Sequence, residues 1–241
     1  FKGRICTMMN DKYRTFYVWG DSLLKGIIFD EVRSRYALLK DNCASVLSGL
    51  LNVEIVNRAK MGCTVTKGRE ILVRDLEKGI SCEAAVLEFG GNDSDFYWNE
   101  VSADPEKEHL PKTRLADFER EMVSMVSILR TNGIDPVIMN LPPIDSDRYF
   151  DFISKGLDAG NILSWLGEKR VIHDFHAQYS HCLDSIASVT GCTLIDVRSA
   201  FLAQPDRSAL MCADGIHPNE RGHRLIQEVF MDKARLLFTV D

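Results

Sequence analysis

The stretch TFYVWGDSL, residues 15–23, begins with a short apolar run and ends with a glycine, an aspartate, a serine and a leucine. The run over residues 15–19 has the length of a strand, is rich in aromatic residues, and shows little alternation between polar and apolar positions. Such a run is typical of a strand that is buried on both faces of a parallel sheet. Gly20-Asp21-Ser22-Leu23 therefore lies at the carboxyl end of a predicted strand.

Four more runs of this kind follow along the chain, at residues 53–56, 84–89, 136–141 and 193–197. The segments between them are longer, and two of them carry apolar residues at three- and four-residue steps, which is typical of amphipathic helices. The clearest helical segments are residues 114–130 and residues 220–238, the second with Asn219 as its predicted N-cap. Strands that alternate with helices predict an α/β fold, in which helices cover both faces of one parallel sheet. Ligands bind such sheets beyond the carboxyl ends of the strands.

The chain has 241 residues and a formal net charge of −6. Its length fits one large domain or two small ones, and because no linker or repeat divides it, we expect a single domain over residues 1–241. A negative net charge without a run of basic residues argues against nucleic acid as a partner.

The seven cysteines are an odd set without a C-x-x-C pair: Cys6, Cys43, Cys63, Cys82, Cys182, Cys192 and Cys212. Such scattered cysteines predict reduced thiols in a reducing compartment, so a cytoplasmic location is expected. No apolar stretch is long enough to span a membrane. The first residues, Phe1-Lys2-Gly3-Arg4, do not form a secretion signal, and since the first residue is not methionine, a removed segment stays open.

Polar residues follow the predicted strands at the same edge of the sheet. They are Asn57 and Gly62 after the second strand, Gly90-Gly91-Asn92-Asp93 after the third, Pro142-Pro143-Ile144-Asp145 after the fourth, and Asp214-Gly215-Ile216-His217-Pro218-Asn219 before the last helix. Each motif alone also fits a turn or a helix N-cap. Together they place serine, asparagine, aspartate and histidine at one edge, and an acyl-transfer site requires these residue types.

The chemistry assigns a task to each of these side chains. The hydroxyl of Ser22 is a weak nucleophile until a base takes its proton, and His217 suits that task because the ordinary pKa of histidine is about 6.5. Asp214, three positions earlier, can hold the imidazole in one tautomer. The N–H groups of Ser22 and Gly62 and the Asn92 amide are candidate donors to the oxyanion.

This set of motifs resembles the GDSL, or SGNH, family of serine esterases and lipases. The matching segments are Gly20-Asp21-Ser22-Leu23, Asn57 with Gly62, Gly91-Asn92-Asp93 and Asp214-Gly215-Ile216-His217-Pro218, and they occur in the order of the family. The resemblance implies a three-layer α/β/α fold with a flavodoxin-like, five-stranded parallel sheet of order 2-1-3-4-5. Ala59 departs from the pattern, since many members carry glycine there, which puts the shape of that loop in doubt.

The resemblance also implies the roles of the site residues. Ser22 would be the nucleophile, His217 the general base, and Asp214 the residue that orients His217, while Ser22, Gly62 and Asn92 would form the oxyanion hole. The implied activity is hydrolysis of carboxylic esters of small molecules through an acyl-enzyme, without a cofactor or a metal. Sugar acetates, short acyl esters, lysophospholipids and thioesters all stay open as substrates, and the sequence does not predict the oligomeric state.

Three alternatives are weighed against this interpretation. An α/β-hydrolase is disfavoured because its Gly-x-Ser-x-Gly elbow would need glycine where Leu24 stands. A binding module could use the same sheet edge for a small anionic ligand without turnover. A metal hydrolase could use His173, His176 and His181 with Asp174, although these fit a polar helix face better than a set of convergent ligands.

Two long connections and two cysteines lie near the predicted site. The connections over residues 93–112 and 142–170 are rich in aromatic residues, which could wall an acyl or sugar pocket or cap the core. Cys63 and Cys212 lie close in sequence to the predicted site residues, and we interpret them as packing residues.

Overall fold

The computed structural model describes residues 15–238 of the chain. Its central sheet consists of five parallel strands in the order β4-β1-β5-β6-β7. In that order the strands are β4 (Glu54–Asn57), β1 (Thr15–Gly20), β5 (Ala84–Glu88), β6 (Asp135–Met139) and β7 (Thr193–Ile195). Counted along the chain within this sheet, the order is 2-1-3-4-5, so the predicted fold class and strand order are confirmed.

The predicted strands agree with the observed ones to within two residues at each end. The largest differences are two residues each, at β6, which ends at Met139 rather than at residue 141, and at β7, which ends at Ile195 rather than at residue 197. Directly after β6, the side-chain amide of Asn140 donates hydrogen bonds of 2.8 Å to both Asp184 and Asp196. Pro142 and Pro143 follow, and proline has no N–H to continue a ladder.

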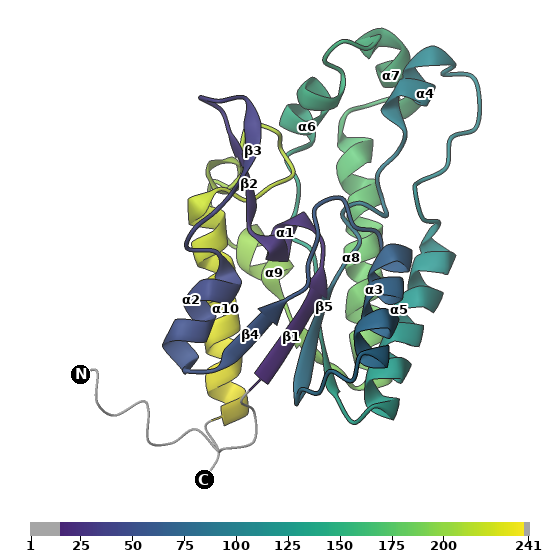
Figure 1. Cartoon of the computed structure of the whole chain (residues 1–241). Coiled ribbons are helices and arrows are strands. Elements are labelled where there is room, and N and C mark those ends of the chain that lie inside the picture. The colour runs from purple at the N-terminus through teal and green to yellow at the C-terminus, as the bar shows by residue number, and fades with distance from the viewer. Residues whose placement is uncertain (1–14, 239–241) are drawn as a thin grey trace.

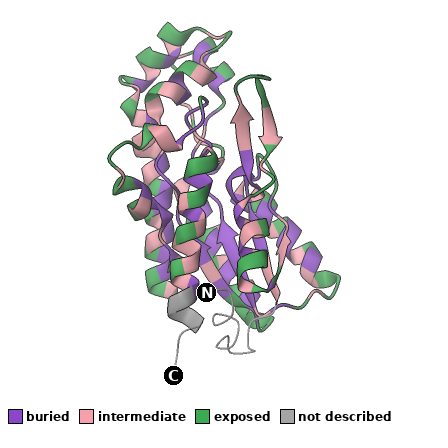
Figure 2. Cartoon of the chain, turned by 90° about the vertical axis from the view of Figure 1, so that its left-hand side faces the viewer, coloured by how far each residue is buried: buried purple, intermediate pink, exposed green. Residues whose placement is uncertain are grey.

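Helices cover both faces of the sheet (Figure 1). On one face lie α2 (Cys43–Leu51), α9 (Val197–Leu202) and α10 (Glu220–Phe238), and on the other α3 (Val65–Glu77), α5 (Leu115–Thr131) and α8 (Arg170–Thr190). Each layer of helices encloses its own cluster of buried apolar side chains against the sheet. Buried residues accordingly concentrate around the strands and on the inner sides of the helices (Figure 2).

The helix predicted over residues 220–238 coincides with α10, and that predicted over residues 114–130 is α5, shifted by one residue. The predicted cap is also present, because the Asn219 side-chain oxygen accepts hydrogen bonds from the N–H groups of Arg221 and Gly222.

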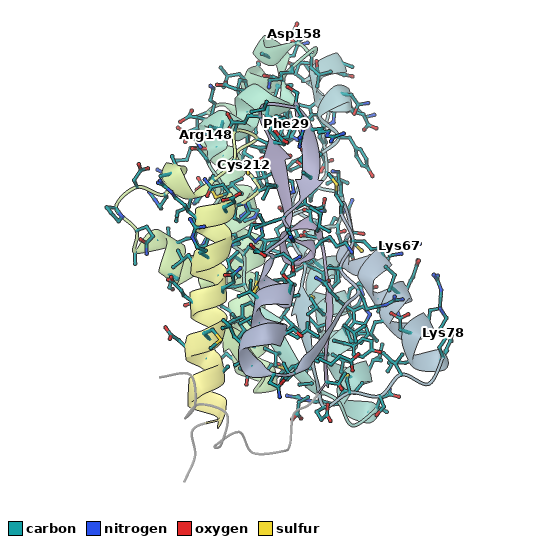
Figure 3. All side chains as sticks on the ribbon, turned by 60° about the vertical axis from the view of Figure 1, so that its left-hand side comes forward. Phe29, Lys67, Lys78, Arg148, Asp158 and Cys212 are labelled. Carbon is teal, nitrogen blue, oxygen red and sulfur yellow. The ribbon has the colours of Figure 1, made fainter. Side chains whose placement is uncertain are left out.

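The structure also contains a β-hairpin outside the main sheet, which the sequence did not predict. Strands β2 (Ile27–Asp30) and β3 (Arg35–Leu38) pair in antiparallel fashion directly after the short helix α1 (Ser22–Lys25). The hairpin rises above the carboxyl edge of the sheet (Figure 1) and is fixed there by a hydrogen bond from the Phe29 N–H to the Cys212 sulfur, two residues that lie close together in Figure 3. It therefore brings additional side chains to the predicted site.

The two long connections form small helices above the same edge of the sheet (Figure 1). These helices are α4 (Trp98–Ala103), α6 (Ser146–Ile153) and α7 (Ala159–Leu166), and a short 3₁₀ helix, η1 (Ser208–Leu210), lies later in the chain. Aromatic and aliphatic residues of α4, α6, α7 and the start of α8 form a third buried cluster. The connections thus have a core of their own, which holds them in place.

The six cysteines that lie within the described residues are free thiols, and Cys6 lies outside that range. Between residues 15 and 238, no helix has the length and apolar character required to cross a membrane.

Candidate active site

The turn at the end of β1 positions Ser22 as the first residue of α1. The side chain of Asp21 caps this helix by accepting a hydrogen bond from the Leu23 N–H at 2.9 Å. Gly20 is required because a Cβ there would lie 2.9 Å from both the backbone oxygen and the Oε2 of Glu88. Ser22 is consequently held at the sheet edge, with 9% of its surface exposed.

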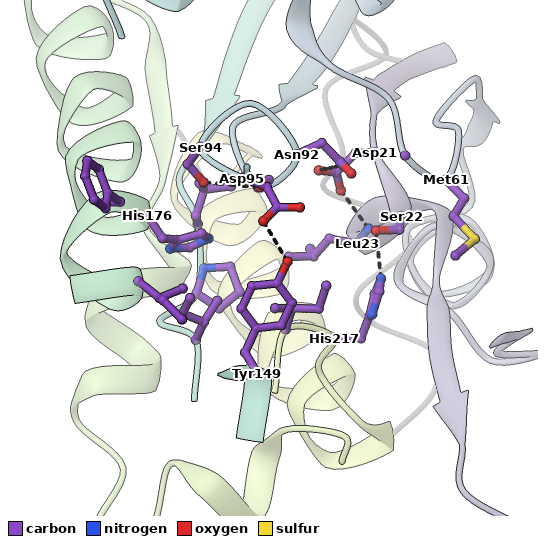
Figure 4. A pocket seen from close by; sticks show the side chains of 18 of the residues that line it. Asp21, Ser22, Leu23, Met61, Asn92, Ser94, Asp95, Tyr149, His176 and His217 are labelled. Carbon is purple, nitrogen blue, oxygen red and sulfur yellow. Dashed lines mark hydrogen bonds between the residues drawn. The ribbon is translucent and has the colours of Figure 1, made fainter. Parts of the chain in front are cut away.

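A row of hydrogen bonds joins Ser22, His217 and Asp214. The Ser22 Oγ lies 2.8 Å from His217 Nε2, and His217 Nδ1 lies 2.6 Å from Asp214 Oδ2. Because a carboxylate only accepts, the ring proton belongs on Nδ1, which leaves Nε2 free to accept the serine proton. The Asp214 Oδ1 also accepts the His217 backbone N–H at 3.1 Å, so the aspartate fixes both the ring and the backbone of His217. Figure 4 shows the Ser22 hydroxyl facing the ring of His217.

Three groups that the sequence predicts as oxyanion donors border this serine. The Ser22 N–H begins α1, and the first N–H groups of a helix have no acceptor within it. Gly62 lines the same cavity with a φ of 72°, a left-handed conformation that favours glycine. The Asn92 amide also borders it and donates one hydrogen to Asp21 Oδ2 at 2.9 Å, which leaves its second hydrogen for another acceptor.

Alanine at position 59 fits the loop between β4 and Gly62. Ala59 is 1% exposed, and its N–H donates to the side-chain oxygen of Asn57 at 3.0 Å. The Asn57 amide in turn donates to the Leu24 carbonyl at 2.8 Å, which ties this loop to the turn that carries Ser22.

A cavity of about 170 Å³ extends from Ser22 towards α8. Apolar side chains form much of its wall, and aromatic side chains from both long connections contribute to it, among them Phe96, Trp98 and Tyr149. The two roles weighed for these connections are therefore combined, since their aromatic residues line the cavity and also pack in the third cluster.

Asp95 fastens the two connections to each other. Its carboxylate accepts hydrogen bonds from the Tyr149 hydroxyl at 2.7 Å, from the Trp98 indole at 2.8 Å and from the Lys112 ammonium at 2.8 Å. The bond to Tyr149 is drawn in Figure 4. Because these partners come from both connections, Asp95 gives the cavity a fixed wall.

The histidines that were considered as metal ligands lie in different surroundings. His176 is 7% exposed and lines the cavity, and burial lowers its pKa to about 3, so the ring is neutral. His173 is half-buried with Nδ1 3.3 Å from the Ile144 carbonyl, and His181 is exposed. Across the part of the chain that the structure describes, no three His, Cys, Asp or Glu side chains come close enough together to hold a metal ion.

The hairpin supplies Tyr36, which sequence reasoning missed. Its ring packs edge-on against the ring of His217 with centroids 5.2 Å apart, and it also contacts Phe152. Burial raises the pKa of Tyr36 to about 12, so it lines the cavity as a neutral phenol. The four residues between β2 and β3 contain neither glycine nor asparagine, so the usual hairpin signal was absent.

Glu88 is another site residue that sequence reasoning missed, and His176 was considered only as a metal ligand. Glu88 ends β5, is fully buried and lines the cavity, and its signal was a lone carboxylate in an otherwise apolar run. The place of His176 in the cavity wall could not be predicted, because its burial depends on how α8 packs.

Cys63 and Cys212 are 4% exposed, and burial raises the pKa of each thiol to about 11. Both thiols are therefore protonated near neutral pH, whereas a cysteine nucleophile would need to be a thiolate.

A parallel sheet whose carboxyl edge gathers serine, histidine and carboxylate side chains beside a cavity is the architecture of an α/β hydrolytic enzyme. Residues 18–225 match the GDSL-like Lipase/Acylhydrolase family, and the chain belongs to that family. Its members are ester hydrolases of the lipase and acylhydrolase type, and the chain is an enzyme of this kind.

Solved structures of the same fold share little sequence with this chain. A lipase/acylhydrolase from Enterococcus faecalis is 18% identical, with a TM-score of 0.62 over 92% of this chain and 96% of that protein. TesA is 17% identical, with a TM-score of 0.62 over 93% and 99%. A variant of Axe2, an acetyl xylan esterase from Geobacillus stearothermophilus, is 17% identical, with a TM-score of 0.66 over 97% and 99%. No curated protein sequence matches this chain.

We expect acid to destabilise the fold, because His223 of α10 is a buried histidine. Burial lowers the pKa of His223 to about 4, whereas a histidine in the unfolded chain has a pKa of about 6.5. The unfolded state therefore binds an extra proton between these pH values, and the free energy of unfolding falls as the pH falls through that window. Replacing His223 with glutamine should make the acid dependence shallower by up to about 1.4 kcal/mol per pH unit between pH ~6 and ~4.5.

Urea unfolding of both proteins across this window measures the difference. The comparison is needed because buried acids act in the opposite sense: burial raises the pKa of Asp93 to about 6, so its proton stabilises the fold in acid. Parallel curves for the wild type and the glutamine variant would contradict the assignment to His223.

Proposed function

We propose that this chain hydrolyses carboxylic esters through an acyl-enzyme on Ser22. The observation that carries the proposal is the row of hydrogen bonds from Ser22 through His217 to Asp214, at the wall of a cavity that can hold a substrate. This row supports the proposal because acyl transfer through a serine needs a base beside the hydroxyl and a carboxylate that orients the base.

In the first step, the Ser22 oxygen attacks the ester carbonyl carbon while His217 Nε2 takes the serine proton. The imidazolium that forms is stabilised by Asp214, which lies 2.6 Å from the other ring nitrogen. The negative charge on the carbonyl oxygen would be held by the N–H groups of Ser22 and Gly62 and by the second amide hydrogen of Asn92.

In the second step, the bond to the alcohol oxygen breaks, and His217 gives its proton to the leaving alcohol. Water then attacks the acyl-enzyme, with His217 again as the base, and releases the carboxylic acid and free Ser22. The leaving alcohol must lie next to His217 to receive its proton. The acyl group therefore extends away from His217, into the cavity that reaches α8 (Figure 4).

The cavity suggests the size of the acyl group. A volume of about 170 Å³ is close to the roughly 150 Å³ of an apolar cavity that holds a benzene ring, so the space suits about six carbon atoms. Acetyl groups, the substrate named for the acetyl xylan esterase, would leave much of this space unfilled. We therefore extend the proposal to short, apolar acyl groups.

The rates of p-nitrophenyl esters from acetate to laurate should follow this size. Each buried methylene contributes about 0.8 kcal/mol, so kcat/KM should rise by up to ~4-fold per carbon as far as hexanoate and fall beyond octanoate. A maximum at acetate or at laurate would contradict the proposed acyl size.

A matched pair of variants on α8 tests whether the acyl group lies in the cavity. Ile172 lines the cavity, so Ile172→Phe should move the optimum to a shorter ester, whereas Val189→Phe, at an 88% exposed position of the same helix, should leave the optimum in place.

A further inference from the structure

Glu88 is a buried carboxyl group directly behind the turn that carries Ser22. It is the last residue of β5, pairs with Gly20 in the parallel register, and is 0% exposed. Its Oε2 accepts hydrogen bonds from the N–H of Asp21 at 3.2 Å and from the N–H of Leu24 at 3.4 Å. These two N–H groups flank Ser22 on both sides, so Glu88 braces the turn from beneath.

Asp21 connects Glu88 to the opposite side of the site. One oxygen of Asp21 accepts the Leu23 N–H, and the other accepts the Asn92 amide at 2.9 Å. Asp21 is itself only 3% exposed, and its carboxyl group and that of Glu88 influence each other's pKa, because they lie next to each other. In Figure 4 the Asp21 carboxylate lies beside Asn92 and above Ser22. The orientation of the Asn92 amide thus depends on a carboxylate that has a second carboxyl group behind it.

Two buried carboxyl groups in contact cannot both ionise at neutral pH. Burial raises the pKa of Glu88 well above its ordinary value, and the negative charge of Asp21 raises it further. The pKa of Asp21 is also raised by burial, but the Leu23 N–H, the nearby His217 and the Asn92 amide all favour its charged form. The pair consequently holds one proton, on Glu88, which leaves Asp21 as the anion that accepts from Asn92.

We propose that Glu88 is a positioning residue, which holds the turn around Ser22 through its hydrogen bonds and, through Asp21, aims the Asn92 amide at the oxyanion. This inference rests on the proposed esterase activity of Ser22. It concerns a side chain outside the set of motifs that predicted the site.

The shared proton has a consequence for the transition state. During the attack of Ser22, negative charge develops on the substrate oxygen that Asn92 is proposed to stabilise. With one proton on the pair, the single negative charge beside Asn92 is stabilised by the hydrogen bonds that Asp21 accepts from the Leu23 N–H and the Asn92 amide. Without that proton, a second charge would repel the first and oppose the developing oxyanion. Glu88 should therefore affect kcat rather than the binding of substrate.

Two variants of similar length separate the polar role of Glu88 from its volume. Glu88→Gln keeps an oxygen for the two N–H groups and an N–H for Asp21, so kcat should fall by no more than ~3-fold. Glu88→Met removes these interactions and should lower kcat by about 10–100-fold with KM changed by less than ~2-fold, because a small misplacement of a catalytic donor costs about that much. The kcat values are taken per active site, counted from the burst of an activated ester, and thermal melts verify folding.

A double-mutant cycle tests whether Glu88 acts through Asn92. Asn92→Ala alone should lower kcat by about 10²–10³-fold. If Glu88 acts through this amide, the combined loss in Glu88→Met/Asn92→Ala should be at least ~5-fold smaller than the product of the two single losses. Should the methionine variant not fold, Asp21→Asn replaces it in the cycle, because it removes the charge that shares the proton yet keeps an oxygen for the Leu23 N–H.

Equal losses in the glutamine and methionine variants, an unchanged kcat per site in Glu88→Met or its replacement Asp21→Asn, or losses that multiply in the cycle would each overturn the inference. These outcomes require a wild type that hydrolyses esters through Ser22. Failure of the wild type to do so would instead count against the proposed function.

Discussion

Replacing Ser22 with alanine should lower kcat for an activated ester by about 10⁵-fold or more. The serine oxygen is the group that would form the bond to the acyl carbon, and alanine offers no atom in its place. The fold should persist, because the Ser22 side chain contributes little apolar packing and its hydroxyl hydrogen-bonds to the side chain of His217. Initial rates of p-nitrophenyl ester hydrolysis, with circular dichroism melts of the same samples, measure both quantities.

Ser185→Ala is a suitable control, because Ser185 lies exposed on α8 and hydrogen-bonds to the His181 carbonyl. It should hydrolyse the ester at the rate of the wild type. A Ser22→Ala variant that is folded and still retains more than a few per cent of the activity would show that Ser22 is not the nucleophile.

Replacing Asp214 with asparagine should lower kcat by about 10³–10⁴-fold. Asp214 is 0% exposed, and its Oδ2 can only accept from His217, which keeps the ring proton on Nδ1. An asparagine amide can donate to Nδ1 instead, which favours the tautomer with the proton on Nε2. That tautomer cannot accept the proton of Ser22.

Asp174→Asn provides the matched control, because Asp174 pairs with Arg170 on the surface of α8. It should leave kcat near that of the wild type. If Asp214→Asn lost less than ~10-fold, Asp214 would not be the residue that sets the tautomer of His217.

The strand ends explain why the fold could be predicted well from the sequence. Runs such as residues 84–89 are long enough for a strand and apolar throughout, and in a parallel sheet their carboxyl ends meet at one edge. Local motifs at those ends therefore came to lie close together, although Ser22 and His217 are 195 positions apart. The alternation of strands and helices predicted the fold, and the residue types at the strand ends predicted the chemistry.

The rest depends on packing between segments that carry no local signal. Tyr36 reaches His217 only because the hairpin folds over the sheet edge, where it is fixed by Cys212. Asp95 binds residues from both long connections, and neither of those connections has a regular pattern. The shape of the cavity, and with it the acyl size, arises from these tertiary contacts.

The most direct test of the proposed mechanism is mass spectrometry of the protein after reaction with a fluorophosphonate, followed by digestion. The account predicts one phosphonyl group per chain, on the peptide that contains Ser22, with loss of esterase activity in proportion to labelling and no adduct in Ser22→Ala. A folded protein that gives no adduct would favour a binding module on the same sheet edge. An adduct on another residue, with ester hydrolysis lost in step, would contradict the assignment of Ser22 as the nucleophile.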